Sequence, residues 1–99
     1  MTSNEQIAST ILSQFGRTFD LMVGMESAVV IENGIQFSHA KGNKGINKLV
    51  VTLNARDTYD LAFWKITSKT AKEVVGVGEV YNNQLAGVFE NVTGLLTHF

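Results

Sequence analysis

The chain has 99 residues, of which 44% are hydrophobic and 17% charged, a composition that predicts one small globular domain over residues 1–99. It contains no cysteine, which excludes a disulfide framework, a thiolate nucleophile and a Cys-ligated metal. The net charge of −1 gives no overall positive field that would draw the chain to nucleic acid.

The first predicted element is a helix over residues 4–15. Ser3 is a suitable N-cap and Gln6 follows three residues later, which is a capping-box pattern. Ile7, Ile11 and Phe15 then recur at helical spacing. The segment lacks the basic residues and apolar core of a secretory signal, and no stretch reaches the ~20 apolar residues of a membrane span. We therefore expect a soluble, cytoplasmic protein without a membrane partner.

Strand periodicity follows over residues 19–23, and a hairpin comes next. Asn33-Gly34 is a strong hairpin signal because both residues tolerate the positive φ of a tight turn. With that turn, Val30 is expected to face Phe37 across the two strands. Val29 and Ile31 then belong to the opposite face of the sheet.

A second pair of strands is predicted over residues 46–54 and 58–67, after a glycine- and lysine-rich loop. Alternation divides each strand into two rows. The rows expected to face the helices are Leu49, Val51 and Leu53, and Tyr59, Leu61 and Phe63.

The C-terminal part of the chain predicts a weak strand and a strong helix. The valines of residues 68–80 favour a short edge strand, which Gly76 and Gly78 weaken. A helix is expected over residues 80–93, because Tyr81, Leu85 and Phe89 belong to an apolar stripe that continues to Leu96. Gly94 suits the left-handed position that ends a helix.

The order of elements indicates an α+β domain: an N-terminal helix, an antiparallel meander of about five strands, and a C-terminal helix packed on one sheet face. Two amphipathic helices can cover one face of such a sheet but not both.

The second face of the sheet is therefore the candidate interaction surface. It should carry a tryptophan among aliphatic side chains, and soluble proteins usually avoid exposing such a patch unless it binds something. We expect self-association through this face, most simply as a homodimer. The alternative is that the first helix crosses over and buries this face in a three-layer domain. The predicted interface residues are Val29, Ile31, Val50, Ala62, Trp64 and Ile66.

The loop between the hairpins offers a different function. Lys41, Lys44 and Lys48 are interleaved with glycines, and lysines beside glycine backbone can contact phosphates. The alternative function is single-stranded nucleic-acid binding through these lysines. The loop is equally explained as a solvated connection, and it lacks the spacing of a phosphate-binding P-loop.

Catalytic and metal-binding patterns are not found. His39 and His98 are far apart in the sequence with no carboxylate at a recognised ligand spacing, and a histidine near a strand end is more often a packed residue. There is no G-x-S-x-G motif. We expect no catalytic, cofactor-binding or metal-binding residues, and thus a protein that is not an enzyme.

Three segments carry a resemblance: FDLMVGMES, INKLVVTLNARDTYDLAFWKI and EVYNNQLAGVFENVTGLLT. Their motif residues are Phe19, Met22 and Gly24; Ile46, Asn47, Thr52, Leu53, Asn54, Asp57, Tyr59, Asp60 and Phe63; and Phe89, Glu90, Thr93 and Gly94. With these motifs, most of the chain resembles a family of small proteins of unknown function encoded by tailed phages and prophages. Met25, Glu26 and Ser27 depart from the family's pattern. The resemblance implies a phage origin, the cytoplasm of a bacterial host, and a phage or host protein as a possible partner; it implies no catalytic residue.

Overall fold

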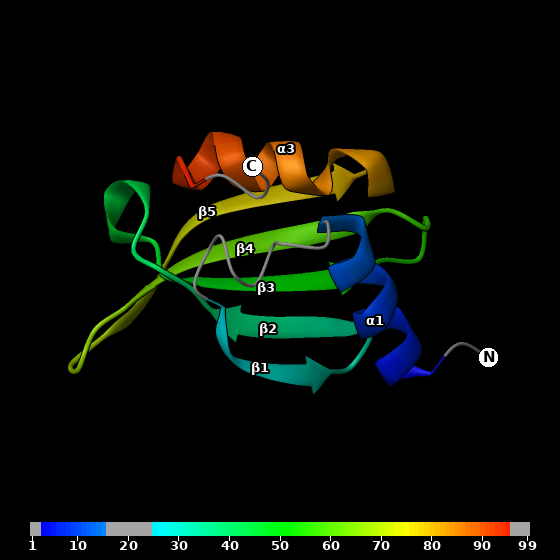
Figure 1. Cartoon of the computed structure of the whole chain (residues 1–99), viewed down its shortest axis with the longest axis horizontal. Helices are drawn as coiled ribbons and strands as arrows, with labels where there is room; N and C mark the ends of the chain where they lie inside the picture. The colour runs from blue at the N-terminus through cyan, green and yellow to red at the C-terminus, as the bar shows by residue number, and fades with distance from the viewer. Residues whose placement is uncertain (1–2, 16–24, 96–99) are drawn as a thin grey trace.

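The computed structural model describes residues 3–15 and 25–95, which form one antiparallel sheet with two α-helices (Figure 1). The sheet has five strands: β1 (Glu26–Ile31), β2 (Gly34–Ser38), β3 (Lys48–Leu53), β4 (Tyr59–Ile66) and β5 (Ala71–Val80). The helices are α1 (Asn4–Phe15) and α3 (Leu85–Thr93), and 3-10 turns lie at Asn43–Gly45 and Asn82–Gln84. Neighbours in the sequence are neighbours in the sheet, so the predicted α+β meander is confirmed. The strand predicted over residues 19–23 lies outside the described residues.

Helix α1 has the predicted bounds, and its start is explained by the capping box. The Gln6 backbone N–H donates to Ser3 Oγ at 3.2 Å, and the Ser3 N–H donates to Gln6 Oε1 at 3.1 Å. Ile7, Ile11 and Phe15 are buried, so the apolar stripe faces the core as predicted.

The β1–β2 hairpin corrects the predicted register. Val30 pairs with Ile35 and not with Phe37, because the turn is at Glu32 and Asn33 and the following glycine already belongs to β2. Asn33 alone takes the positive φ in this turn, at 59°. The shift is by two residues, so each side chain keeps its predicted face.

Gly34 is required by the sheet and not by the turn. A Cβ at this position would lie 1.9 Å from the Val51 carbonyl oxygen on β3. The strand backbones approach closely here, and only glycine permits that approach.

Strands β3, β4 and β5 place the predicted core rows together. Leu49 pairs with Phe63 and Val51 with Leu61, and all four side chains are buried. Strand β5 is an edge strand as expected, but it is ten residues long instead of short. It follows β4 in spite of its glycines because the register shifts twice along the pair.

The start predicted for the C-terminal helix is wrong. Val80 is the last residue of β5, where it pairs with Tyr59, and α3 begins only at Leu85. Tyr81, which the helical periodicity assigns to the apolar stripe, is therefore 60% exposed. The predicted end is confirmed, because Gly94 has φ 75° and its N–H donates to the Glu90 carbonyl at 2.8 Å.

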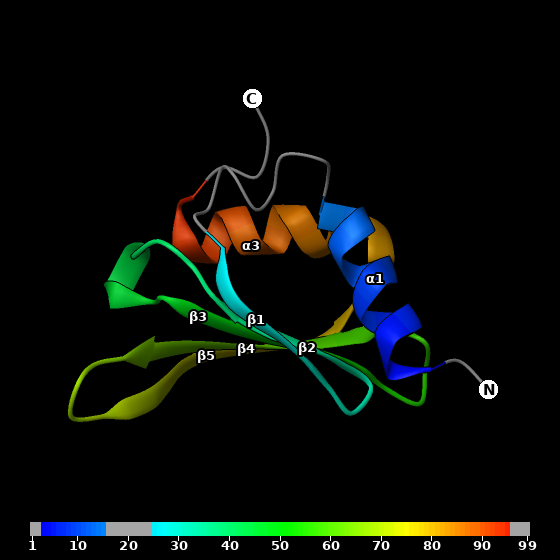
Figure 2. The ribbon, with the colours of Figure 1, turned by 60° about the horizontal axis from the view of Figure 1, so that its bottom comes forward.

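Both helices lie on the same face of the sheet (Figure 2). The Phe89 ring of α3 lies 6.0 Å from Phe15 of α1 and 6.4 Å from Phe63 of β4, so helices and sheet share one core. The alternative in which the first helix covers the other face is therefore wrong. We call the face opposite the two helices the open face, since no element of residues 3–15 or 25–95 lies over it.

Candidate functional site

Strand register brings the predicted interface residues to the open face. Val29 pairs with Gln36, which pairs with Val50, and Val50 pairs with Ala62, so these residues form one row across four strands. Trp64 lies in the next row, opposite Lys48. Val50, Ala62 and Trp64 follow or alternate with buried core residues of β3 and β4, so they point away from the helices.

The exposure of these side chains is uneven. Val29 is 48% exposed, whereas Ile31, Val50, Ala62, Trp64 and Ile66 are partly buried. The indole Nε1 of Trp64 is itself shielded, and it has no hydrogen-bond partner among the described residues. Trp64 thus lies on the open face with its one polar atom unsatisfied, which is unusual for a buried donor.

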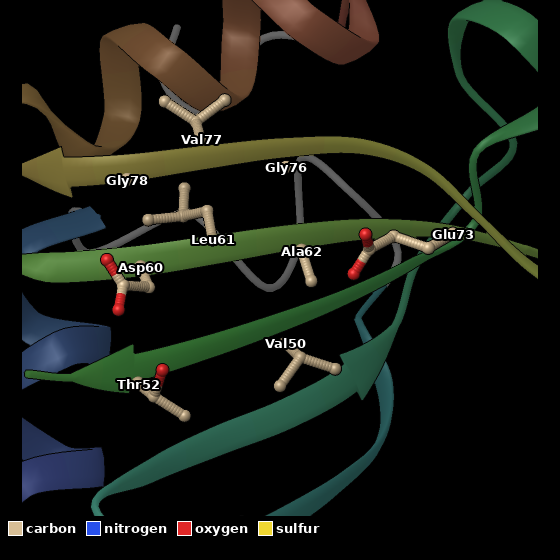
Figure 3. A pocket seen from close by; sticks show the side chains of 9 residues that line it. All are labelled: Val50, Thr52, Asp60, Leu61, Ala62, Glu73, Gly76, Val77 and Gly78. Carbon is tan, nitrogen blue, oxygen red and sulfur yellow. The ribbon is translucent and has the colours of Figure 1, made fainter.

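The open face contains a hollow of about 290 Å³. Small residues form it, since Ala62 on β4 is paired with Gly76 on β5. The carboxylates of Asp60 and Glu73 lie on either side of Ala62 (Figure 3). The lining residues are Val50, Thr52, Asp60, Leu61, Ala62, Glu73, Gly76, Val77 and Gly78. Sequence reasoning missed this hollow, although the two glycines in one strand were a signal for it.

The Asp60 carboxylate is held in place by its own chain. Its Oδ1 accepts hydrogen bonds from Asn54 Nδ2 at 3.2 Å and from the Glu79 backbone N–H at 3.3 Å. Asn54 also accepts from the Thr58 N–H at 3.2 Å, and Arg56 forms an ion pair with Glu79. The turn between β3 and β4 therefore fixes one end of the hollow.

The three lysines singled out in the sequence do not form one cluster. Lys41 and Lys44 belong to the loop around Asn43–Gly45, whereas Lys48 is paired with Trp64 on the open face. A Cβ built on Gly45 would lie 3.6 Å from Lys41 Cε and 3.1 Å from Lys65 Cε, so those two stems converge beside the loop.

The same loop packs against the C-terminal end of α3. Asn43 Nδ2 donates to the Val92 carbonyl at 3.5 Å, and a Cβ on Gly42 would lie 2.6 Å from the Thr93 carbonyl oxygen. The loop thus packs against the C-terminal end of the helix, where positive charge is favourable. Gly42 and Asn43 are in this way explained without a phosphate ligand.

His39 is a packed residue near the core. It is 6% exposed, its ring lies 5.2 Å from Phe89 and 6.2 Å from Phe37, and its Nδ1 is 2.7 Å from the Ala40 carbonyl oxygen. Burial lowers the pKa of His39, and the bond to Ala40 offsets part of that effect. Within residues 3–15 and 25–95, no three His, Asp or Glu side chains gather as metal ligands would.

Comparisons with known protein families, with curated proteins and with solved structures find no match to this chain. The likeness to phage-encoded proteins remains a prediction from the sequence motifs. In the part of the chain that is described, neither helix has the length and apolar character needed to cross a membrane.

Proposed function

We propose that the protein is a small non-enzymatic interaction module that binds another protein through its open face, most simply a second copy of itself. The observation that carries the proposal is the gathering of Val29, Val50, Ala62 and Trp64 on a sheet face that no described element covers. A phage origin, and with it action in the cytoplasm of a bacterial host, is part of the proposal and is supported by the motif resemblance alone.

Trp64 is the anchor of the proposed interface. Tryptophan buries a large apolar area with few rotatable bonds, and it is among the residues that contribute most to protein–protein binding. Its Nε1 is already shielded by its own chain, so the contact with a partner is made by the apolar part of the ring. The ring favours a partner at this position over water.

The test is the oligomeric state of Trp64→Glu, measured by size-exclusion chromatography with light scattering. We expect a wild-type dimer and a variant that is monomeric and folded by circular dichroism, because a charge on the open face opposes association without entering the core. Asn91→Glu, which adds the same charge to an exposed position of α3, should leave the dimer intact. A wild-type protein that stays monomeric at high concentration would contradict self-association.

Single-stranded nucleic-acid binding is the second candidate. It is favoured by the convergence of Lys41 and Lys65 beside Gly45, which concentrates positive charge at one end of the molecule. Fluorescence anisotropy with a labelled oligonucleotide at low salt tests it. Lys41→Gln with Lys65→Gln should weaken binding more than Lys48→Gln, which lies on the open face. The absence of any complex at low salt would exclude this function.

A further inference from the structure

On the open face, the residues that β3 and β5 pair with β4 differ in charge and in size. In one row, Lys48 of β3 and Glu73 of β5 are both paired with Trp64 of β4. In the next row, Val50 and Gly76 are both paired with Ala62. Strand β3 thus presents a cation and a branched side chain, while β5 presents a carboxylate and a glycine.

These two sides are complementary in charge and in shape. Neither Lys48 nor Glu73 forms an ion pair with another residue of the described ranges. Val50 projects beside the hollow, whereas a Cβ on Gly76 would meet one atom within 4 Å, Glu73 Oε2 at 3.8 Å. If β3 of one copy lay over β5 of a second copy, Lys48 would face Glu73. Val50 would then fill the hollow beside Gly76.

We propose that two copies pack open face to open face about a two-fold axis that runs along β4. This arrangement rests on the proposed self-association and specifies its geometry. A two-fold axis along β4 exchanges the β3 and β5 sides, so Lys48 of each copy meets Glu73 of the other and each Val50 enters the hollow at Gly76. Trp64 and Ala62 lie on the axis and meet their own counterparts. The two sheets overlap over β3, β4 and β5, so Val29 on β1 lies outside this contact.

The arrangement agrees with how sheets pack. An axis along the strands keeps the strand directions of both sheets aligned, which is one of the two common face-to-face packings. The row after Val50 and Ala62 contains Thr52 and Asp60. Since Asp60 is on β4, the arrangement brings the two Asp60 carboxylates together at the same end of the interface, which is an unfavourable contact. Each Asp60 carboxylate already accepts hydrogen bonds from Asn54 and from the Glu79 N–H of its own chain, which offset part of the cost of covering it.

Filling the hollow is the first test. Gly76→Val adds a side chain where the monomer has open space, and valine favours strands, so the variant should fold. In the dimer the new side chain would collide with the partner's Val50. We expect the dissociation constant from sedimentation velocity to rise about tenfold or more. The control is Gly87→Ala on α3, where a Cβ meets nothing within 4 Å and self-association should not change.

Exchanging the charges is the second test. Lys48→Glu alone and Glu73→Lys alone should each weaken the dimer, because each sets like charges against one another. The double variant should recover most of the lost affinity, which no purely structural effect of the single changes would produce. If Trp64→Glu separates the copies while Gly76→Val and the charge exchange have no effect, the open face is the interface but the axis along β4 is wrong. If the wild type itself is monomeric, both the proposed function and this arrangement fail.

Discussion

Phe89 lies where the two helices and the sheet meet. It is fully buried, and its ring contacts those of Phe15, Phe63 and His39. Phe89→Ala should lower the free energy of unfolding by about 3–5 kcal/mol, because it leaves a large cavity between fixed elements. Chemical denaturation measures the loss. Tyr81→Ala, at a residue that is 60% exposed, should change stability by no more than about 0.5 kcal/mol. A loss below about 1 kcal/mol for Phe89→Ala would contradict the described core.

His39 makes the stability of the fold depend on pH. Its pKa is lowered in the folded state by burial, so the unfolded chain, with an ordinary histidine pKa of about 6.5, binds the proton more readily. The contribution of His39 to stability is complete above that value. It is lost progressively as the pH falls below 6.5 toward the lower folded pKa.

Urea denaturation of the wild type and of His39→Gln, repeated at several pH values, tests this dependence. The wild type should lose stability between neutral and mildly acidic pH more steeply than the variant, which lacks the titrating group. The slope that remains in His39→Gln measures the background from other groups. Parallel pH profiles would show that His39 takes up its proton as easily in the folded protein as in the unfolded chain.

At the scale of the elements, the position of Gly34 sets the contact between β2 and β3. A Cβ there would lie 1.9 Å from backbone oxygen of Val51, which cannot move without disturbing the sheet. Gly34→Ala should therefore cost about 1–3 kcal/mol, the usual range for overpacking. Asn33→Gly is the matched control, because Asn33 has φ 59° and glycine adopts that conformation without strain. Chemical denaturation should show a loss for Gly34→Ala and little or none for Asn33→Gly.

The same glycine shows why the faces were predictable from the sequence and the register was not. Alternation assigns Val30 and Ile35 to the helix side, and that assignment depends only on the period of a strand. The register depends on the approach of β3, a contact between distant parts of the chain that the Asn33-Gly34 signal does not contain. The late start of α3 has a similar cause, because pairing of Val80 with Tyr59 overrides the helical pattern.

At the scale of the whole molecule, the sequence predicted which side chains share the open face but not the hollow among them. The shared face follows from alternation within strands such as β4. The hollow arises where Gly76 is paired with Ala62 and Glu73 with Trp64, and a register shift between Phe63 and Trp64 separates these two pairings. A shift of this kind depends on the whole sheet and is not encoded in one segment.

The proposed self-association would link the stability of the whole molecule to its concentration. If the folded form is a dimer, each tenfold increase in protein concentration stabilises it by about 1.4 kcal/mol of dimer, because unfolding also separates the copies. The wild-type unfolding midpoint in urea, followed by circular dichroism, should therefore rise with protein concentration. In Gly76→Val the midpoint should begin to rise only at protein concentrations about tenfold higher, because its dimer dissociates more readily while its core is unchanged. A wild-type midpoint that stays constant over a hundredfold range of concentration would mean that the chain unfolds as a monomer, with Trp64 shielded only by its neighbours on the open face.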